Sequence, residues 1–374
     1  MITMKLRYKI AVGFLLLIVI SIASLTAILS YDSPCETTVA LAGSTNAMKA
    51  IVYRCYGSPD VLNVEDIEKP VPTDNEVLVK VHAAGVNPLD WHYMRGEPRF
   101  MRLMSGIGKP KETRLGVDFA GTVEAVGANV SKFKPGDEVF GGGTGAFGDY
   151  IVIREDRAIV LKPDNVTFEQ AAAVTIAAIT ALQALRDKGK LQPGQKVLIN
   201  GASGGVGTYA VQIAKSFGAE VTGVCSTRNV EMVRSLGADH IIDYKVEDFT
   251  KGDERYDLII DNVGNHPLSA LKNAMNTQGI LVMVGGSGSG IEMLLTPIQA
   301  FLMSTFGDQE FLSFLARLKP EDLGVIGDLM REEKVMSVID RTYPLNDVPA
   351  AIAYSEEGHA RGKIVISMEP NSGG

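Results

Sequence analysis

Cysteine is scarce in this sequence. Among its 374 residues there are three cysteines, Cys35, Cys55 and Cys225, and none of them forms a C-x-x-C pair. Three cysteines are too few for the disulfide framework that small secreted domains use in place of a large core. The folded part of the chain is therefore predicted to be built for a reducing compartment.

Basic charge is also in short supply. Lys and Arg number 36 against 44 Asp and Glu, which gives a formal net charge of −8 at pH 7. A protein whose main partner is nucleic acid carries a basic stripe that dominates its field, so this balance excludes that class. The chain has 46% hydrophobic and 21% charged residues and no internal repeat. It is long enough for two domains with a large core, and its composition is typical of a soluble α/β enzyme.

Short strands separated by Gly and Pro occupy residues 48–167. In the stretch EVLVKVHA, for example, Val77, Val79 and Val81 recur at every second position and share one face. This region is predicted to form a β-rich, barrel-like domain. The closing stretch GKIVISM is again a strand, so about residues 335–370 are predicted to return to this domain and complete it.

Strands and helices alternate over residues 168–334. KVLIN, AEVTGVC, DHIIDY, YDLIID and GILVMVG are apolar strands, and helical stretches lie between them. Strand–helix alternation of this kind is typical of a doubly wound parallel sheet. The chain is thus predicted to be an α/β protein with a β-rich domain and a separate parallel-sheet domain.

A glycine-rich turn, GASGGVG, follows the strand KVLIN and opens an amphipathic helix. Aligned to the dinucleotide fingerprint G-x-G-x-x-G, it places Ala202, Gly204 and Gly207 at the three glycine positions. Gly204 would let the backbone approach a pyrophosphate, and Gly207 would let helix and strand pack closely, with the helix N-terminus facing the phosphates. The turn is predicted to contact the cofactor through Ala202, Ser203, Gly204, Gly205, Val206 and Gly207.

The acid that usually follows such a turn is missing. About twenty residues after it, where an NAD-binding unit has Asp or Glu for the ribose 2′-hydroxyl, the chain has Cys225, Ser226, Thr227 and Arg228. Hydroxyls can donate hydrogen bonds to a 2′-phosphate, and a guanidinium can pair with it. The cofactor is therefore predicted to be NADPH; the alternative is that Arg228 is only a solvated surface charge.

A family resemblance rests on seven stretches: AAGVNPLDW, LGVDFAGTVEAVG, KPGDEVFG, AAAVTIAAITALQAL, GASGGVGTYAVQIAK, LGADHIIDY and GHARGKIVI. From Met48 to about Met368 the chain resembles the medium-chain dehydrogenase/reductase superfamily, in its zinc-free quinone oxidoreductase branch. The resemblance implies a GroES-like catalytic domain, a Rossmann domain with the cofactor in the cleft between them, and usually a homodimer.

No metal is expected. Zinc-dependent members of the family carry a Cys where this chain has Asn87, and a His-Glu pair where it has Val117 and Asp118. Residues 165–190, where a third ligand would come, contain no Cys or His. A tetrahedral zinc site needs thiolate and imidazole ligands, so the prediction is a zinc-independent enzyme.

The resemblance also implies a set of site residues. Asn87, Asp90 and Tyr93 should line the nicotinamide end, although Asn87 and Asp90 are also common turn residues and Tyr93 could be ordinary packing. The further residues that the resemblance places at the cofactor are Thr180, Tyr244, Asn262, Val263, Gly285 and Lys363.

The predicted activity is the reduction of a quinone or an α,β-unsaturated carbonyl. NADPH would deliver hydride, and Asn87 or Tyr93 would stabilise charge on the carbonyl oxygen. An enoyl-thioester reductase and a zinc-free NADP-dependent alcohol dehydrogenase are the enzymatic alternatives. The non-enzyme alternative is a membrane-tethered NADPH-binding or scaffold protein.

The membrane alternative comes from the N-terminus, where residues 10–29 contain no charge. Twenty apolar residues in a helix can cross about 30 Å of hydrocarbon. Residues 1–30 are therefore predicted to be an N-terminal apolar helix that anchors the protein in a membrane, and residues 31–47 a linker. A cleaved signal and a mis-assigned start, with Met48 as the true one, stay open. The positive-inside rule would place the rest of the chain outside the cytoplasm, whereas NADPH supply favours a cytoplasmic domain, which is the side predicted.

Overall fold

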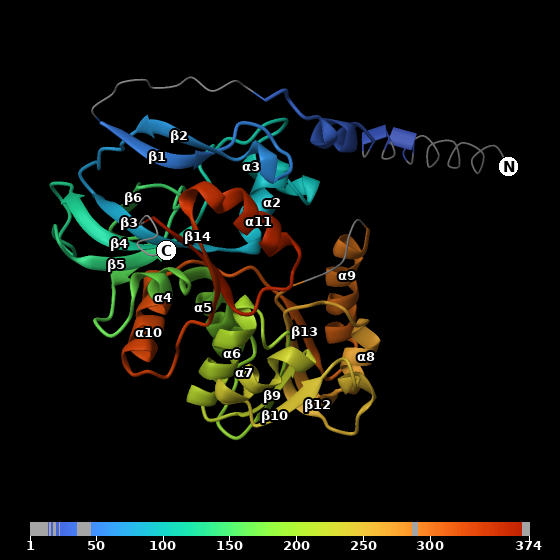
Figure 1. The fold of residues 1–374 in the computed structure, drawn as a ribbon. Helices are drawn as coiled ribbons and strands as arrows, with labels where there is room; N and C mark the ends of the chain where they lie inside the picture. The colour runs from blue at the N-terminus through green and yellow to red at the C-terminus, as the bar shows by residue number, and fades with distance from the viewer. Residues whose placement is uncertain are drawn as a thin grey trace, which may run out of the picture.

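The structure is a computed structural model and describes residues 14, 16–17, 20–21, 23–35, 46–285 and 291–368. Figure 1 shows a β-rich catalytic domain, in blue to green, beside an α/β domain in green to orange. The red C-terminal strands run back from the second domain into the first. The α/β class, the GroES-like domain and the parallel Rossmann sheet are thus confirmed.

The catalytic domain has the following elements: β1 (Ala47–Val52), η1 (Pro59–Val61), β2 (Asn63–Glu68), β3 (Glu76–Val86), α2 (Pro88–Arg95), η2 (Arg99–Met101), α3 (Arg102–Ser105), β4 (Asp118–Val126), β5 (Glu138–Gly142), β6 (Tyr150–Arg154), β7 (Ile159–Leu161), β14 (Ile339–Pro344), η6 (Leu345–Asp347), α11 (Val348–Glu356) and β15 (Lys363–Ser367). Its main sheet has seven strands, with the order β14-β15-β3-β4-β5-β7 and β6 paired to β3. Val77, Val79 and Val81 lie together in the core of this domain, as predicted, but Leu78 is buried as well, so burial does not strictly alternate along β3.

The Rossmann domain has the following elements: α4 (Phe168–Ala172), α5 (Thr175–Leu182), η3 (Gln183–Lys188), β8 (Lys196–Asn200), α6 (Gly205–Ser216), β9 (Glu220–Cys225), η4 (Thr227–Asn229), α7 (Val230–Ser235), β10 (His240–Asp243), η5 (Phe249–Lys251), β11 (Tyr256–Asp261), α8 (Leu268–Asn273), β12 (Met275–Met283), α9 (Ile291–Thr305), β13 (Glu310–Ser313) and α10 (Pro320–Arg331). Its six strands are parallel, with the order β10-β9-β8-β11-β12-β13. The strand order reverses between β8 and β11, and ligands of open α/β sheets bind at the carboxyl ends of the strands at such a point.

Residues 29–35, called here the N-terminal strap, lie against η2 and α3 of the catalytic domain. The buried Arg102 side chain donates to Leu29 O at 3.0 Å and pairs with Asp32 at 2.8 Å. The Ser33 amide donates to Gly108 O at 2.8 Å. The strap is therefore part of the folded domain, although the sequence predicts a linker from residue 31 onward.

A disulfide between Cys35 and Cys55 fastens the strap to the loop after β1, with a Cα–Cα distance of 5.0 Å. A single disulfide is not a framework of the kind that was excluded, but this pairing was not predicted. The two cysteines are 20 residues apart in sequence, and a low cysteine count does not reveal that the fold brings these two together. Cys225 is a free thiol at the end of β9, and its burial raises the pKa to about 11.

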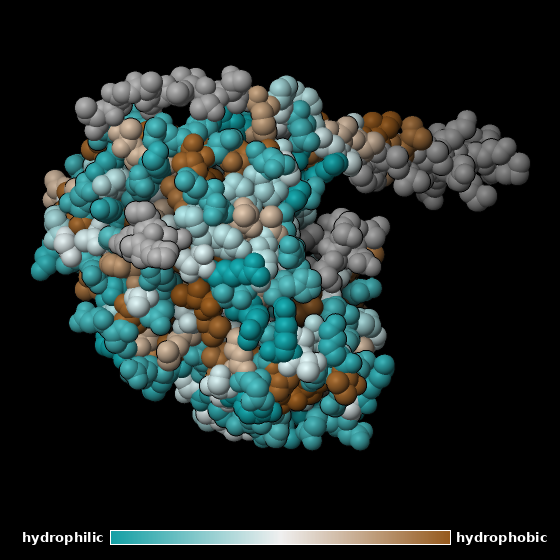
Figure 2. All heavy atoms as spheres, viewed as in Figure 1, coloured by the Kyte–Doolittle hydropathy of each residue, from teal (hydrophilic) through white to brown (hydrophobic). Residues whose placement is uncertain are grey.

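The prediction of a membrane-anchored protein is contradicted. Within the described part of the chain, no helix combines the length and the apolar composition needed to cross a membrane. Several residues of the predicted span 10–29 lie outside the described part, and residues 23–30 are helical. The described side chains from residue 14 to Ile28 are exposed, but Leu29 is buried where the strap begins. Figure 2 shows hydrophobic atoms on this protruding segment. Of the described residues in the predicted span, only Leu29 is buried against the protein, and none belongs to a helix that could cross a membrane.

Candidate active site and cofactor site

The glycine turn between β8 and α6 has the close packing that its sequence predicts. A Cβ at Gly207 would lie 2.1 Å from Gly201 O and 2.8 Å from Ala202 Cα. A Cβ at Gly204 would meet only Gly201 O, at 3.5 Å. Gly207 is therefore required by the packing of helix on strand, whereas the open side of Gly204 leaves room for a ligand to reach the backbone.

The turn is joined directly to the catalytic domain. Gly204 forms a parallel bridge with Gly362, and the Gly362 amide donates to Ser203 O at 2.9 Å. A Cβ at Gly205 would lie 3.3 Å from Lys363 Cδ, so the lysine stem runs beside the start of α6. The residues that follow the bridge thus lead from the helix N-terminus into the catalytic domain.

The ammonium of Lys363 ends in a buried polar cluster. Lys363 Nζ donates to Val86 O at 2.9 Å and to Asn87 Oδ1, and it lies 3.9 Å from Asp118 Oδ2. Asn87 Nδ2 donates to the same Asp118 oxygen at 3.0 Å. Both Asp118 oxygens also accept from the Ile176 amide at 3.2 Å. Asn87, Asp118 and Lys363 are each no more than 3% exposed, so the cluster is shielded from water.

Secondary-structure boundaries position this cluster. Asn87 is the N-cap of α2, Asp118 is the first residue of β4, and Lys363 is the first residue of β15. The strands β15, β3 and β4 are neighbours in one sheet, which brings the three ends together. Asn87 has both ends of its side-chain amide hydrogen-bonded within the protein.

Burial shifts the charges of the cluster. Burial raises the pKa of Asp118 to about 6, although the nearby Lys363 ammonium opposes the rise. Burial also raises the pKa of Asp90 to about 7, and the Asp118 charge adds to the effect. The pKa of Lys363 is lowered by burial, while both carboxylates oppose that shift. One ammonium thus interacts with two carboxyl groups. Their raised pKa values mean that part of each carboxyl population is protonated near neutral pH.

Asp90 and Tyr93 lie on α2, beyond Asn87. Asp90 Oδ2 accepts a hydrogen bond from the backbone N–H of Asn87 at 2.7 Å and so closes the first turn of the helix. This is the structural role in a turn that the sequence left open for Asp90. Tyr93 is half-buried and packs against the catalytic core. Tyr53 was missed by sequence reasoning; burial raises its pKa, and Tyr56, Asp90 and Tyr93 raise it further by charge. Its stretch carries no motif that could have pointed to it.

The carboxyl ends of β8, β11 and β12 bring several predicted residues together. A Cβ at Gly201 would meet Val263 Cγ2 at 2.8 Å and Asn262 Cβ at 3.5 Å, and a Cβ at Gly285 would lie 2.2 Å from Asn262 O. These residues therefore line one edge of the sheet beside the glycine turn. Thr180 lies elsewhere, inside α5, where its hydroxyl donates to Ile176 O at 2.7 Å.

A polar brace at the same edge was not anticipated. Asn200 Nδ2 donates to Asp261 Oδ1 at 2.9 Å and to Asn265 Oδ1 at 3.0 Å. Asn200 and Asp261 are the last residues of β8 and β11. Because adjacent parallel strands end at one edge, their polar last residues were a signal for this brace.

The predicted 2′-phosphate residues lie around the end of β9. Arg228 Nη2 donates to His359 O at 2.9 Å, so its guanidinium reaches the catalytic domain. Thr227 Oγ1 donates to Asp243 Oδ2 at 2.5 Å. Ser226 Oγ accepts from Asn229 Nδ2 at 3.2 Å, and Tyr244 is 52% exposed. The structure therefore groups these side chains and adds an acid, Asp243, that sequence reasoning overlooked.

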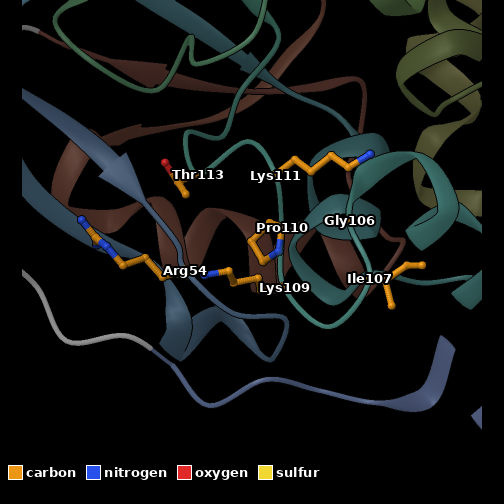
Figure 3. Close-up of a pocket in the computed structure, with 7 residues that line it drawn as sticks. All are labelled: Arg54, Gly106, Ile107, Lys109, Pro110, Lys111 and Thr113. Atoms are coloured by element: carbon orange, nitrogen blue, oxygen red, sulfur yellow. The ribbon is translucent and has the colours of Figure 1, made fainter. Parts of the chain in front are cut away.

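A cavity of about 440 Å³ lies elsewhere, beside the strap. It is lined by Arg54, Gly106, Ile107, Lys109, Pro110, Lys111 and Thr113. In Figure 3 the side chains of Arg54 and Lys111 point away from one another, and Arg54 pairs with Glu65. Its basic groups do not converge on a ligand, and none of the predicted site residues lines it.

Comparison with known proteins shows what this arrangement belongs to. A quinone oxidoreductase homolog of the Arabidopsis thaliana chloroplast envelope is 34% identical over 339 residues, which cover 85% of this chain and 98% of that protein. The chain belongs to the medium-chain dehydrogenase/reductase superfamily. Residues 73–164 match the model of the alcohol dehydrogenase GroES-like domain, and residues 236–366 match that of the zinc-binding dehydrogenase family.

Two further similarities agree with this membership. A mitochondrial NAD(P)H oxidoreductase of Bos taurus is 33% identical over 371 residues, 87% of this chain and 90% of that protein. The structure of a quinone oxidoreductase from Coxiella burnetii has a TM-score of 0.75 and 31% identity, and covers 86% of this chain and all (100%) of that one. This member of the superfamily is an NAD(P)H-dependent oxidoreductase, and the alternative of a membrane-tethered scaffold finds no support.

The absence of zinc stays a prediction. In the described residues, no group of three or more His, Cys, Asp or Glu side chains is arranged to hold a metal ion. The prediction rests on Asn87, Val117 and Asp118 at the positions where zinc-dependent relatives carry ligands, and not on the contents of the structure.

Proposed function

We propose that this protein uses NADPH to reduce a quinone or an α,β-unsaturated carbonyl, without zinc and as a homodimer. One observation carries the proposal: the bridge between Gly204 and Gly362 places the pyrophosphate-binding turn beside the buried Asn87, Asp118 and Lys363 cluster. A dinucleotide on the turn would reach toward the catalytic domain. The quinone substrate is supported by the names of the relatives.

The residues around the turn fit a dinucleotide. The open side of Gly204 admits a pyrophosphate, and α6 begins there without a side-chain cap on its N-terminus, which leaves its end available to an anion. Asn262, Val263 and Gly285 would flank the nicotinamide side. Ser226, Arg228 and Tyr244 offer hydroxyls and a guanidinium to a 2′-phosphate, which supports NADPH as the cofactor.

When bound, NADPH supplies a hydride to the electron-poor carbon of the substrate. The chain's own residues position this step. Lys363 and Asp118 hold the Asn87 amide, so Asn87 is a positioning residue and not the group that contacts the substrate oxygen. Tyr93, half-buried beyond it on α2, has the hydroxyl that we propose to donate to the carbonyl oxygen.

An activity screen tests the proposal. The purified protein is expected to oxidise NADPH in the presence of quinones or enals, with the absorbance of NADPH as the readout. Enoyl thioesters and simple ketones, assayed in the same way, separate the reductase alternatives. Treatment with a chelator should leave the rate unchanged. Failure to oxidise NADPH with any substrate, or loss of activity on chelation, would contradict the function or its zinc independence respectively.

Cofactor preference depends on Arg228 in this proposal. The parent protein is expected to bind NADPH at least about tenfold tighter than NADH, and Arg228→Ala to remove about 1.5–3 kcal/mol of NADPH binding. Titration of both nucleotides by fluorescence measures the two affinities. Arg234→Ala is the matched control, since Arg234 is an exposed arginine on α7 paired with Glu231. Equal affinities in the parent would show that the 2′-phosphate is not recognised.

A further inference from the structure

The acid that the sequence lacks at the end of β9 is supplied in space by the neighbouring strand. β10 pairs with β9 in parallel, and the register places Asp243 beside Cys225. Cys225 is the position where an NAD-binding unit would carry its acid. The Asp243 charge contributes, after burial, to the raised pKa of the Cys225 thiol. A carboxylate therefore stands next to the position from which it is missing in the sequence.

Asp243 also occupies hydrogen-bond donors of the expected phosphate site. Its Oδ2 accepts from the Thr227 hydroxyl at 2.5 Å, and its Oδ1 accepts from the Lys245 amide at 2.9 Å. These hydrogen bonds, with the Thr227 hydroxyl first, lower the pKa of Asp243, so the group is ionised at neutral pH. Thr227, predicted to bind a 2′-phosphate, has its hydroxyl proton directed at a carboxylate instead.

The two possible cofactors differ at this point. An ionised carboxylate is an acceptor only, so it can bind a ribose 2′-hydroxyl but repels a 2′-phosphate. Two cations lie nearby: Arg228 donates through Nη2 to His359 O, and Lys245 Nζ lies 5.1 Å from the centre of the Tyr244 ring. The site thus contains groups that favour each cofactor. The hydroxyls and the Arg228 guanidinium favour the 2′-phosphate of NADPH, whereas the Asp243 carboxylate favours the 2′-hydroxyl of NADH.

We propose that Asp243 is a specificity-determining residue that limits the preference of this enzyme for NADPH over NADH. The carboxylate gives the ribose 2′-hydroxyl of NADH an acceptor and competes with the 2′-phosphate of NADPH for the Thr227 hydroxyl. This inference rests on the proposed function, in that both concern the same dinucleotide site.

Direct binding measurements test the inference without a substrate. Dissociation constants for NADPH and NADH are determined by fluorescence titration for the parent, Asp243→Asn and Glu247→Gln. Asp243→Asn is expected to raise the ratio of the NADH to the NADPH dissociation constant by about tenfold, since one like-charge repulsion and one acceptor are lost together. Glu247→Gln removes the same charge from an exposed side chain on the same loop and should leave the ratio unchanged.

The outcomes separate the two proposals. A parent that binds neither nucleotide overturns the proposed function and this inference with it. A parent that binds them, with a ratio that stays constant or falls in Asp243→Asn, overturns the role of Asp243 alone. Asp243→Ser, which removes the carboxylate without an isosteric amide, should shift the ratio in the same direction; circular dichroism confirms that each variant is folded.

Discussion

Replacement of Lys363 by methionine is expected to lower the free energy of unfolding by about 3–5 kcal/mol at neutral pH. The Lys363 ammonium is buried between Asn87 and Asp118, and methionine keeps most of the stem while removing the charge. The Asp118 carboxylate would then stay in the interior without its cation. Removal of one partner of a buried pair costs more than the pair contributes, because the other charge is left unpaired. Urea denaturation measures the loss.

Two further variants show whether the cost is electrostatic. Lys363→Met combined with Asp118→Asn should recover much of the loss, because the unpaired charge is gone. Lys162→Met is the matched control: Lys162 is 9% exposed, but the side chain of its partner Glu138 is 49% exposed and can turn to water. A smaller loss of about 1–3 kcal/mol is expected there, because Lys162 Nζ also donates to Pro163 O and Val166 O, which would lose this donor. If the two lysine variants lose equally, the buried cluster has no special electrostatic role.

The effect of Lys363→Met should also depend on pH. In the parent, the pKa of Asp118 is about 6 in the folded protein, above the roughly 3.9 of an unfolded aspartate. The folded state therefore binds more protons than the unfolded state between these values, and stability falls as pH rises through them. Without the ammonium, the pKa of Asp118 in the folded protein rises further. The pH range over which stability falls then extends to higher pH. The variant should lose more stability at pH 8 than at pH 5.

Gly207→Ala is expected to weaken NADPH binding by about 100-fold or more and to destabilise the protein by about 1–3 kcal/mol. The new Cβ would lie 2.1 Å from Gly201 O and 2.8 Å from Ala202 Cα. Both contacts are with backbone, so no flexible side chain can give way. The turn must move, and the amides at the start of α6 move with it. Nucleotide titration and thermal unfolding measure the two effects.

Gly204→Ala separates packing from ligand approach within the same turn. Its Cβ would meet one protein atom only, at 3.5 Å, and the backbone of Gly204 has φ −85°, which alanine adopts without strain. The free energy of unfolding of the variant should therefore lie within about 1 kcal/mol of the parent value. The variant should bind NADPH about tenfold more weakly, because the methyl group occupies the side open to the pyrophosphate. Normal affinity in Gly204→Ala would place the pyrophosphate elsewhere.

Local patterns in the sequence were sufficient for the fold class and for the glycine turn. The spacing of Val77, Val79 and Val81 predicted a strand with these side chains on one face, and the order strand, GASGGVG, helix predicted a Rossmann unit. Such patterns are local because strand and helix periods are set by the backbone and the turn by one stretch of glycines. Predictions made from these patterns do not depend on contacts with the rest of the chain.

Contacts between distant segments could not be predicted in this way. Lys363 and Asn87 are 276 residues apart, and nothing in either stretch shows that the ammonium meets the amide. The Cys35–Cys55 disulfide and the strap were missed for the same reason, and the apolar run before the strap was taken for a membrane anchor.

The cofactor site depends both on local sequence patterns and on contacts between distant segments. The sequence by itself determined that a dinucleotide turn is present and that the end of β9 has no acid. Only the tertiary structure placed Asp243 beside that end, because the neighbour of a strand in a parallel sheet is chosen by the packing of the crossover helices and not by the residues adjacent in the chain. Charge acts through space, so the electrostatics of the site were decided by which strands became neighbours.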